Sequence, residues 1–265
     1  MERPSWAPEG IDLNRPNAAR MYDYALGGSH NFAVDREMVE KVEAMLPGSS
    51  LIAHANRAFL RRAVRFCVEA GIRQFLDVGS GIPTVGAVHE VAQAVAPQSR
   101  VVYVDVDPVA VAHGQALLRD NPSATAIAGD LRRPDEILAD PRLVKLLDFG
   151  QPVAVLLIAI LHFIPDDADP WAIVARLRER LVPGSYIVIS HGTPEELPDE
   201  ADSVGQLYRG TSTPLFLRSR SEIERLFTGF EIVEPGITWV TSWRPVPEDD
   251  DADRREILVG VGRRP

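Results

Sequence analysis

Two acidic residues near the ends of neighbouring apolar segments are the strongest chemical feature of this 265-residue sequence. Phe75-Leu76-Asp77-Val78-Gly79-Ser80-Gly81 has the pattern of a buried strand that ends in an acid and two glycines. Residues 101–105 have the pattern of a second buried strand, and it ends in Asp105. In a parallel α/β sheet such strand ends form a nucleoside pocket, where the glycines admit the ligand and the second carboxylate accepts from ribose hydroxyls. The pattern predicts a site for an adenosine-bearing cofactor.

The glycine spacing separates two classes of such cofactor. A dinucleotide site requires G-x-G-x-x-G, so that a pyrophosphate can lie on the following helix N-terminus. Gly79 and Gly81 are present, but Thr84 occupies the third position and Pro83 stiffens the turn. Asp77 would repel a phosphate, whereas a cofactor with a sulfonium and an amino group suits it. A nicotinamide-dependent oxidoreductase remains an alternative, although the sequence also has no Y-x-x-x-K pair.

Alternating strand and helix patterns from Ile72 to His191 must position these residues. They predict an α/β, doubly wound, mostly parallel seven-stranded sheet that is closed by an antiparallel pair. The expected strands beyond the first two cover residues 124–128, 152–160, 185–190, 230–234 and 257–261. The expected helices cover residues 84–95, 108–119, 169–181 and 221–227, and Thr84 is the expected N-cap of the first of them. Residues 194–229 interrupt this pattern, and we expect this insertion to cover a substrate pocket.

The first seventy residues lack any strand pattern and predict a helical cap (residues 1–70) in the same globule as the main domain (residues 71–265). Three helices are expected, at 16–26, 33–45 and 51–70, with Asn14 capping the first. The segment from Met21 to Phe32 is more polar and irregular than a helix hairpin requires. It is either a simple helix stop and turn or a lid over the cofactor, with Tyr22, Gly28 and Asn31 at the site.

Several motifs in order along the chain resemble one bacterial family of predicted S-adenosyl methyltransferases. The motifs are Y-D-Y-x-L-G-G-x-x-N-F at 22–32, F-L-D-x-G-S-G-x-P-T at 75–84, V-Y-V-D-x-D-P at 102–108 and G-S-Y-x-x-x-S-H at 184–191. The resemblance covers residues 13–265 and implies a Rossmann-like fold and S-adenosylmethionine as cofactor. It implies no acceptor. Pro83 departs from the wider methyltransferase class, in which many members have glycine there.

The resemblance also assigns cofactor contacts to individual residues. The loop Gly79-Ser80-Gly81, with Asp77, is expected to pack against the methionine part of the cofactor, and Ala159 is expected beside the same part. Asp105 would hold the ribose, with Val106 next to it. Asp130 would accept from the adenine amino group, and Leu131 would pack on the ring.

Two histidines are candidates for a catalytic role. Methyl transfer from a sulfonium is an in-line displacement that depends largely on positioning, and a base is needed only when the nucleophile must lose a proton. His162 and His191 follow the fourth and fifth predicted strands, at the edge where ligands bind open α/β sheets. We expect His162 to be the better base; the alternative is a structural histidine. No cluster suggests a metal. A non-catalytic S-adenosylmethionine sensor remains the alternative to an enzyme.

The composition narrows the classes of molecule that this protein is expected to bind. The formal net charge is −10, from 38 acidic and 28 basic residues, which disfavours nucleic acid and favours a small-molecule acceptor. Cys67 is the sole cysteine, so no disulfide is expected. The longest apolar run, residues 153–161, is too short to span a bilayer, and no signal segment is visible. We expect a cytoplasmic protein without membrane contact, and the sequence does not predict its oligomeric state.

Overall fold

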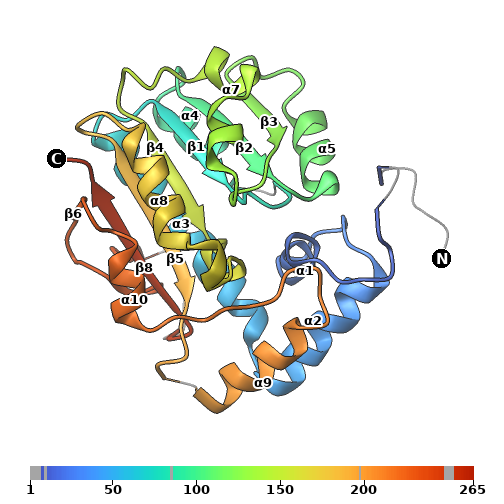
Figure 1. Ribbon diagram of the computed structural model, residues 1–265. Helices are drawn as coiled ribbons and strands as arrows, with labels where there is room; N and C mark the ends of the chain where they lie inside the picture. Colours follow the sequence, from blue (N-terminus) through green and yellow to red (C-terminus); the bar gives the residue numbers. More distant parts are fainter. Residues whose placement is uncertain (1–6, 9–10, 84–85, 197, 248–253) are drawn as a thin grey trace.

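The computed structural model, which describes residues 7–8, 11–83, 86–196, 198–247 and 254–265, is built around one twisted sheet (Figure 1). The strand order is β3-β2-β1-β4-β5-β8-β6, and β7 also pairs with β8. The strands are β1 Gln74–Val78, β2 Arg100–Asp105, β3 Ala124–Ala128, β4 Ala154–Ile158, β5 Tyr186–Gly192, β6 Glu231–Ile232, β7 Thr238–Trp239 and β8 Ile257–Arg263. Strands β1 to β5 are parallel, and β8 is antiparallel to β5.

The predicted doubly wound fold is confirmed. The two-residue strand β7 brings the sheet to eight strands, because residues 238–239 pair with Val259 and Leu258 of β8. The chain crosses the sheet in opposite directions from β1, toward β2 on one side and β4 on the other. The carboxyl ends of these strands therefore border a crevice, which is where ligands bind in this class of fold.

Two apolar layers cover the sheet because neighbouring strand residues point to opposite faces. Phe75 packs with helices α3 and α4 on one face, and Leu76 packs with helices α7 and α8 on the other. The helices of the main domain are α4 Val88–Val95, α5 Pro108–Leu117, α6 Pro134–Leu138, α7 Pro141–Leu146, α8 Pro170–Glu179, α9 Pro198–Tyr208 and α10 Arg220–Arg225. Thr84, the expected cap of α4, lies outside the described residues.

The three predicted cap helices are confirmed as α1 Ala18–Ala25, α2 Ala33–Met45 and α3 Ser49–Glu69. The expectation that Asn14 caps α1 is wrong. Asn17 is the cap, because its side-chain oxygen accepts from the Ala19 amide at 2.8 Å.

The cap and the insertion meet beyond one end of the sheet, where α1, α2 and α9 lie together (Figure 1). The amide of Ser212, just after α9, donates to the Pro16 carbonyl at 2.9 Å. The Ala18 amide donates to the Thr213 hydroxyl at 3.1 Å. Segments almost two hundred residues apart thus form one roof over the crevice. None of the described helices is long and apolar enough to cross a membrane.

Candidate active site

The turn after β1 requires glycine at two positions. Gly79 and Gly81 adopt φ values of 73° and 64°, in the left-handed region that favours glycine. A Cβ atom on Gly79 would lie 2.4 Å from Cγ1 of Ile160. The Gly79 and Ser80 amides both donate to the Val104 carbonyl, at 2.8 and 3.1 Å. The turn is therefore fixed against β2 and presents bare backbone to the crevice.

Asp105, at the end of β2, is held by backbone amides on both sides of its carboxylate. Oδ2 accepts from the Gly81 amide at 2.7 Å, and Oδ1 accepts from the Asp107 amide at 2.8 Å. Burial raises the pKa of Asp105 to about 6, while these backbone hydrogen bonds oppose the rise. Each carboxylate oxygen can still accept another hydrogen bond, and Asp105 lines the cavity together with the exposed Val106.

Asp77 is the second carboxylate of the crevice. Its side chain is buried in β1, and this burial raises the pKa to about 7, opposed by the positive charge of Arg57 and increased by the charge of Asp105. Arg57 comes from α3, and its guanidinium lies 5.8 Å from the centroid of the Tyr22 ring. The cap helices thus bring a cation and an aromatic ring to the acidic strand end.

Tyr22 lines the cavity, and the bonds of its hydroxyl group account for an oxygen of Asn56 that has no hydrogen-bond partner. The hydroxyl donates to the Ala53 carbonyl at 3.0 Å and accepts from Nδ2 of Asn56 at 3.1 Å. Nδ2 is committed to this bond, and Oδ1 of Asn56 is buried and has no hydrogen-bond partner. Burial raises the pKa of Tyr22, so the hydroxyl keeps its proton.

Gly28 and Asn31 are not among the described residues that line the cavity. Nδ2 of Asn31 donates to Oδ2 of Asp23 and to the Gly28 carbonyl, both at 2.9 Å. A Cβ atom on Gly28 would lie 2.1 Å from Oδ1 of Asp23. The polar residues that suggested a lid therefore build the turn between α1 and α2, and only Tyr22 of that set extends into the cavity.

The structure also places Asp130 and Leu131 outside the cavity lining. The Asp130 carboxylate is bound by the Arg132 guanidinium, with a shortest contact of 2.6 Å, and this hydrogen bond lowers the pKa of Asp130. Leu131 is buried in the apolar layer with α6 and α7. The two residues expected at the adenine are therefore not among the described residues that line this cavity.

The end of β4 forms the floor of the cavity. Ala159 has a φ of 53°, unusual for a residue with a Cβ atom, and its amide donates to the Ser190 hydroxyl at 2.8 Å. Ala159, Ile160 and His162 all line the cavity. The bonded, left-handed backbone at Ala159 turns the chain so that these residues face the crevice.

His162 is buried and neutral. Its Nδ1 accepts from the Gly192 amide at 3.1 Å. Burial, followed by the nearby His191 and Arg218, holds its pKa well below 6.5. A neutral imidazole that accepts at Nδ1 carries its proton on Nε2. In this arrangement the second nitrogen is a hydrogen-bond donor, and a base at Nε2 would require the other tautomer.

His191 is fully buried and is not among the described lining residues. Its Nδ1 donates to the Gly192 carbonyl at 2.7 Å, and its Nε2 accepts from Arg218 at 3.0 Å. Burial lowers its pKa to about 4. Arg218 also donates to the carbonyls of Leu161 and Ile164, at 2.9 and 2.7 Å. His191 thus supports the segment after β4 from behind and does not contact the cavity.

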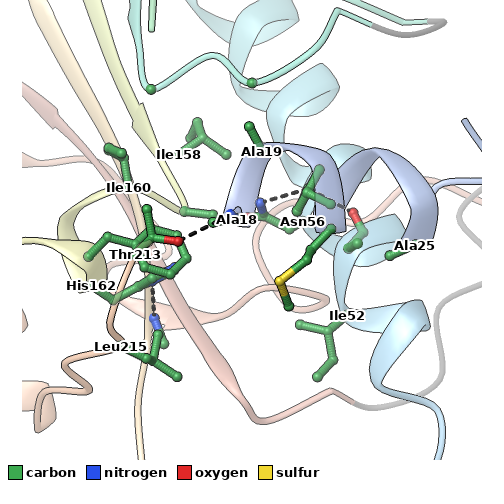
Figure 2. A pocket seen from close by; sticks show the side chains of 18 of the residues that line it. Ala18, Ala19, Ala25, Ile52, Asn56, Ile158, Ile160, His162, Thr213 and Leu215 are labelled. Atoms are coloured by element: carbon green, nitrogen blue, oxygen red, sulfur yellow. Dashed lines mark hydrogen bonds between the residues drawn. The ribbon is translucent and has the colours of Figure 1, made fainter. Parts of the chain in front are cut away.

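The cavity has a volume of about 280 Å³ and runs from the glycine turn into an apolar chamber under the roof. Figure 2 shows His162, Thr213 and Leu215 on one side of it, with Asn56 and Ile52 on the other. Sequence reasoning missed several polar lining residues, namely Asn56, Arg57, Thr193, Tyr208, Thr213 and Glu256. No local motif marks them. These six residues come from four separate segments, which meet only in the folded chain.

Comparison with known proteins decides the family. A family model described as S-adenosyl methyltransferase matches residues 4–265. The chain belongs to the S-adenosyl methyltransferase family. S-adenosylmethionine is therefore the cofactor of this methyltransferase, and nothing in the comparisons favours the sensor or oxidoreductase alternatives. No curated protein matches its sequence.

Solved structures agree with this assignment. This methyltransferase is 41% identical to a DUF574 family protein from Streptomyces avermitilis MA-4680, with a TM-score of 0.92 over 96% of this chain and 99% of that one. It is 40% identical to a candidate methyltransferase from Thermobifida fusca YX, also with a TM-score of 0.92, over 98% and 99% of the chains. Human N-acetylserotonin methyltransferase in complex with S-adenosylmethionine shares the fold at 15% identity, with a TM-score of 0.51 over 94% of this chain and 63% of that one.

The residues at the crevice fit this cofactor. Positive-φ glycines let a ligand approach the backbone, and the fixed carboxylate of Asp105 offers acceptors of the kind that a ribose diol needs. Asp77 and the orphaned Oδ1 of Asn56 suit the ammonium and sulfonium groups of a methionine moiety. Among the described residues, no group of three or more His, Cys, Asp or Glu side chains could hold a metal ion.

Proposed function

We propose that this methyltransferase transfers the methyl group of S-adenosylmethionine to a small-molecule acceptor bound in the apolar chamber. One observation carries the proposal: the glycine turn and the chamber line the same continuous cavity. When bound, the cofactor supplies an electrophilic methyl group on a sulfonium. The chain's own residues have to align an acceptor nucleophile with that group and keep water out.

The cofactor half of the cavity is formed by strand ends. Gly79 and Gly81 allow close approach of the backbone, Asp105 binds the ribose hydroxyls, and Asp77 with Asn56 bind the charged methionine end. Ala159 and Ile160 form the floor at the place where the two halves of the cavity meet. Rigid strand ends are suited to this task because displacement reactions are sensitive to misalignment of about 1 Å.

The acceptor half is formed by the cap and the insertion. Val42, Ile52, Leu60, Val204 and Leu217 give it an apolar lining. A cavity of this size fits a small molecule and is covered by α1 and α9, whereas a nucleic acid would need an open basic surface. The formal charge of −10 supports the same choice.

His162 lies at the boundary between the two halves. In the observed arrangement its Nε2–H can orient an acceptor oxygen or nitrogen by donating a hydrogen bond. The role of base predicted from the sequence requires the proton to move to Nδ1 and the bond from Gly192 to break. We propose orientation as its principal contribution.

Formation of S-adenosylhomocysteine tests the function. The purified protein is incubated with S-adenosylmethionine and a metabolite library, and products are read by mass spectrometry as methylated acceptor plus S-adenosylhomocysteine in equal amounts. Thermal shift with S-adenosylmethionine, S-adenosylhomocysteine and NAD provides the binding arm. Stabilisation by the first two without acceptor-dependent product from any small molecule would contradict the proposal.

A further inference from the structure

One wall of the acceptor chamber carries two buried oxygen atoms that lack hydrogen-bond partners. Oγ1 of Thr193 and Oε2 of Glu256 each lack a partner, and both residues line the cavity. Thr193 is 4% exposed as a whole residue, and the side chain of Glu256 is 15% exposed. An unsatisfied buried acceptor is destabilising, so two of them in one cavity indicate a group that binds there.

The backbone explains why these two side chains act together. Gly192 and Ile257 are the last register partners of β5 and β8. The pairing continues for one more step, because the Thr193 amide donates to the Glu256 carbonyl at 3.0 Å. Residues directly opposite each other on an antiparallel pair place their side chains on the same face. The side chains of Thr193 and Glu256 therefore leave the strand pair on the same face, and both residues line the chamber.

This wall is continuous with the floor where transfer would take place. The Gly192 amide, one residue before Thr193, donates to Nδ1 of His162. A Cβ atom on Gly192 would lie 2.6 Å from Cδ2 of Leu217 and 3.7 Å from Nδ1 of His162. Gly192, which is bonded to His162 and directly precedes Thr193, thus connects this wall to the floor of the cavity.

The charge around the pair identifies the ligand group. Arg254 lies 3.6 Å from Oε1 of Glu256, which is an ion-pair distance longer than a hydrogen bond, so the carboxylate keeps its capacity to accept. Oε2 is the other oxygen of that carboxylate and accepts nothing within the described chain. A carboxylate and a hydroxyl on one face suit a group with several N–H donors and a positive charge, because hydrogen bonds between ionised groups are the strong ones.

We propose that the acceptor of this methyltransferase is a largely apolar molecule that carries an amine, whose ammonium group binds Glu256 Oε2 and Thr193 Oγ1 while its apolar part fills the chamber. An ammonium nitrogen has no lone pair, so the methyl group goes to a second nucleophilic atom of the same molecule. This inference rests on the proposed function and names the class of acceptor. Glu256 and Thr193 are binding residues for the amine, and the proposal assigns them no step in methyl transfer.

Three size-matched probes test the proposal by binding alone. 2-Phenylethylamine, 2-phenylethanol and phenylacetate differ mainly in the charge and donor capacity of the polar end. Each is titrated by calorimetry and ligand-observed NMR into the full-length protein, with and without saturating S-adenosylhomocysteine. We expect the amine to bind at least about tenfold more tightly than the alcohol, and the acid to bind least.

Substitutions of Glu256 and Thr193 test whether these residues cause the preference for the amine over the alcohol. Glu256→Gln should remove the preference for the amine over the alcohol, and Thr193→Val, which is nearly isosteric, should reduce it. Glu231→Gln is the matched control: it also removes one carboxylate charge, but Glu231 is exposed on β6 and pairs with Arg263 at 3.5 Å. It should leave all three affinities unchanged. Circular dichroism establishes that each variant is folded, and Thr193→Val carries the test if Glu256→Gln does not fold.

Several outcomes overturn the proposal. These are equal affinities for the amine and the alcohol, tightest binding of the acid, no binding of the amine at millimolar concentration, or a preference that survives both cavity variants. The proposed function fails separately, when S-adenosylhomocysteine itself does not bind. A protein that binds S-adenosylhomocysteine but ignores the amine retains the proposed function and loses only this inference.

Discussion

The Gly81 amide donates a hydrogen bond of 2.7 Å to the Asp105 carboxylate, which joins the turn after β1 to the end of β2. Asp105 therefore has two tasks, because the carboxylate that is suited to a ribose also holds the turn on which a cofactor would rest. A variant at this position affects both the shape and the chemistry of the site.

Asp105→Ala should weaken S-adenosylhomocysteine binding by at least about tenfold, since each charge-assisted hydrogen bond contributes about 1.5–3 kcal/mol. The free energy of unfolding should fall by about 1–3 kcal/mol, because the amides of Gly81 and Asp107 lose their acceptor. Calorimetry and urea unfolding measure the two effects. Asp130→Ala is the control, with an affinity change below about threefold expected because that carboxylate lies outside the cavity lining. A larger loss in Asp130→Ala than in Asp105→Ala would show that the ribose and adenine contacts lie elsewhere.

The raised pKa of Asp77 predicts how stability changes with pH. Unfolded, this carboxyl ionises near pH 3.8, whereas burial raises its pKa to about 7 in the folded chain. Between these values the folded state binds more protons than the unfolded state, so this group makes the free energy of unfolding fall as the pH rises from about 4 to about 7. Asp77→Asn should remove this contribution, and the difference between wild type and variant in urea unfolding at several pH values measures it. A difference that does not vary with pH would contradict the raised pKa.

The same carboxyl predicts the pH dependence of cofactor binding. An ionised Asp77 attracts the ammonium group of the homocysteine end, so affinity for S-adenosylhomocysteine should increase as the pH rises through about 7. Asp77→Asn should bind more weakly at high pH and show a flatter profile. Calorimetry in buffers of different ionisation enthalpy also detects the proton that Asp77 releases on binding. Equal profiles for the two proteins would remove Asp77 from the binding site.

His162 should stay neutral across the physiological range. Because its pKa is held well below 6.5, it should contribute no inflection to the pH profile of turnover between about pH 6.5 and 8. His162→Ala should lower turnover while changing S-adenosylmethionine affinity by less than about threefold. His162→Asn keeps an acceptor for the Gly192 amide and separates catalysis from folding. An inflection near pH 6.5 that disappears in His162→Asn would support the alternative role as a base.

Gly28 and Gly205 form a matched pair for the turn between α1 and α2. Gly28→Ala should lower the free energy of unfolding by about 1–3 kcal/mol, because its Cβ atom would overlap the buried Asp23 carboxylate. Gly205→Ala in α9 meets no atom within 4 Å and should be neutral or stabilising by up to about 1 kcal/mol. Thermal and urea unfolding compare the two variants. Equal effects would mean that the turn relaxes around Asp23.

The parts of the fold that the sequence predicts are those with a local cause. Strand β4 is recognised because it is an apolar run of strand length, as expected for a strand buried on both faces, and α3 because its apolar residues recur at helical spacing. Helix α9 lies in a stretch whose polarity carries no clear period, and it is not predicted.

The residues of the candidate site also divide into those that a local sequence pattern marks and those that it does not. The glycine turn and Asp105 form one continuous motif with their strands, so the sequence locates them. Asn56 and Glu256 become site residues only because α3 and β8 pack around the crevice, which no local pattern encodes. Asn31 also has a local signal, but polar residues after a glycine pair are equally suited to bonding the buried Asp23, and Asn31 is not among the described lining residues.

The hydrogen bonds from Ser212 to Pro16 and from Ala18 to Thr213 have a consequence for biosynthesis. The ribosome makes α1 before its partners on the far side of the roof, which follow almost two hundred residues later in the chain. Until then the acceptor chamber has no cover, and its apolar walls are open to water and to chaperones. The nascent chain can assemble the strands that hold the glycine turn before it encloses the chamber.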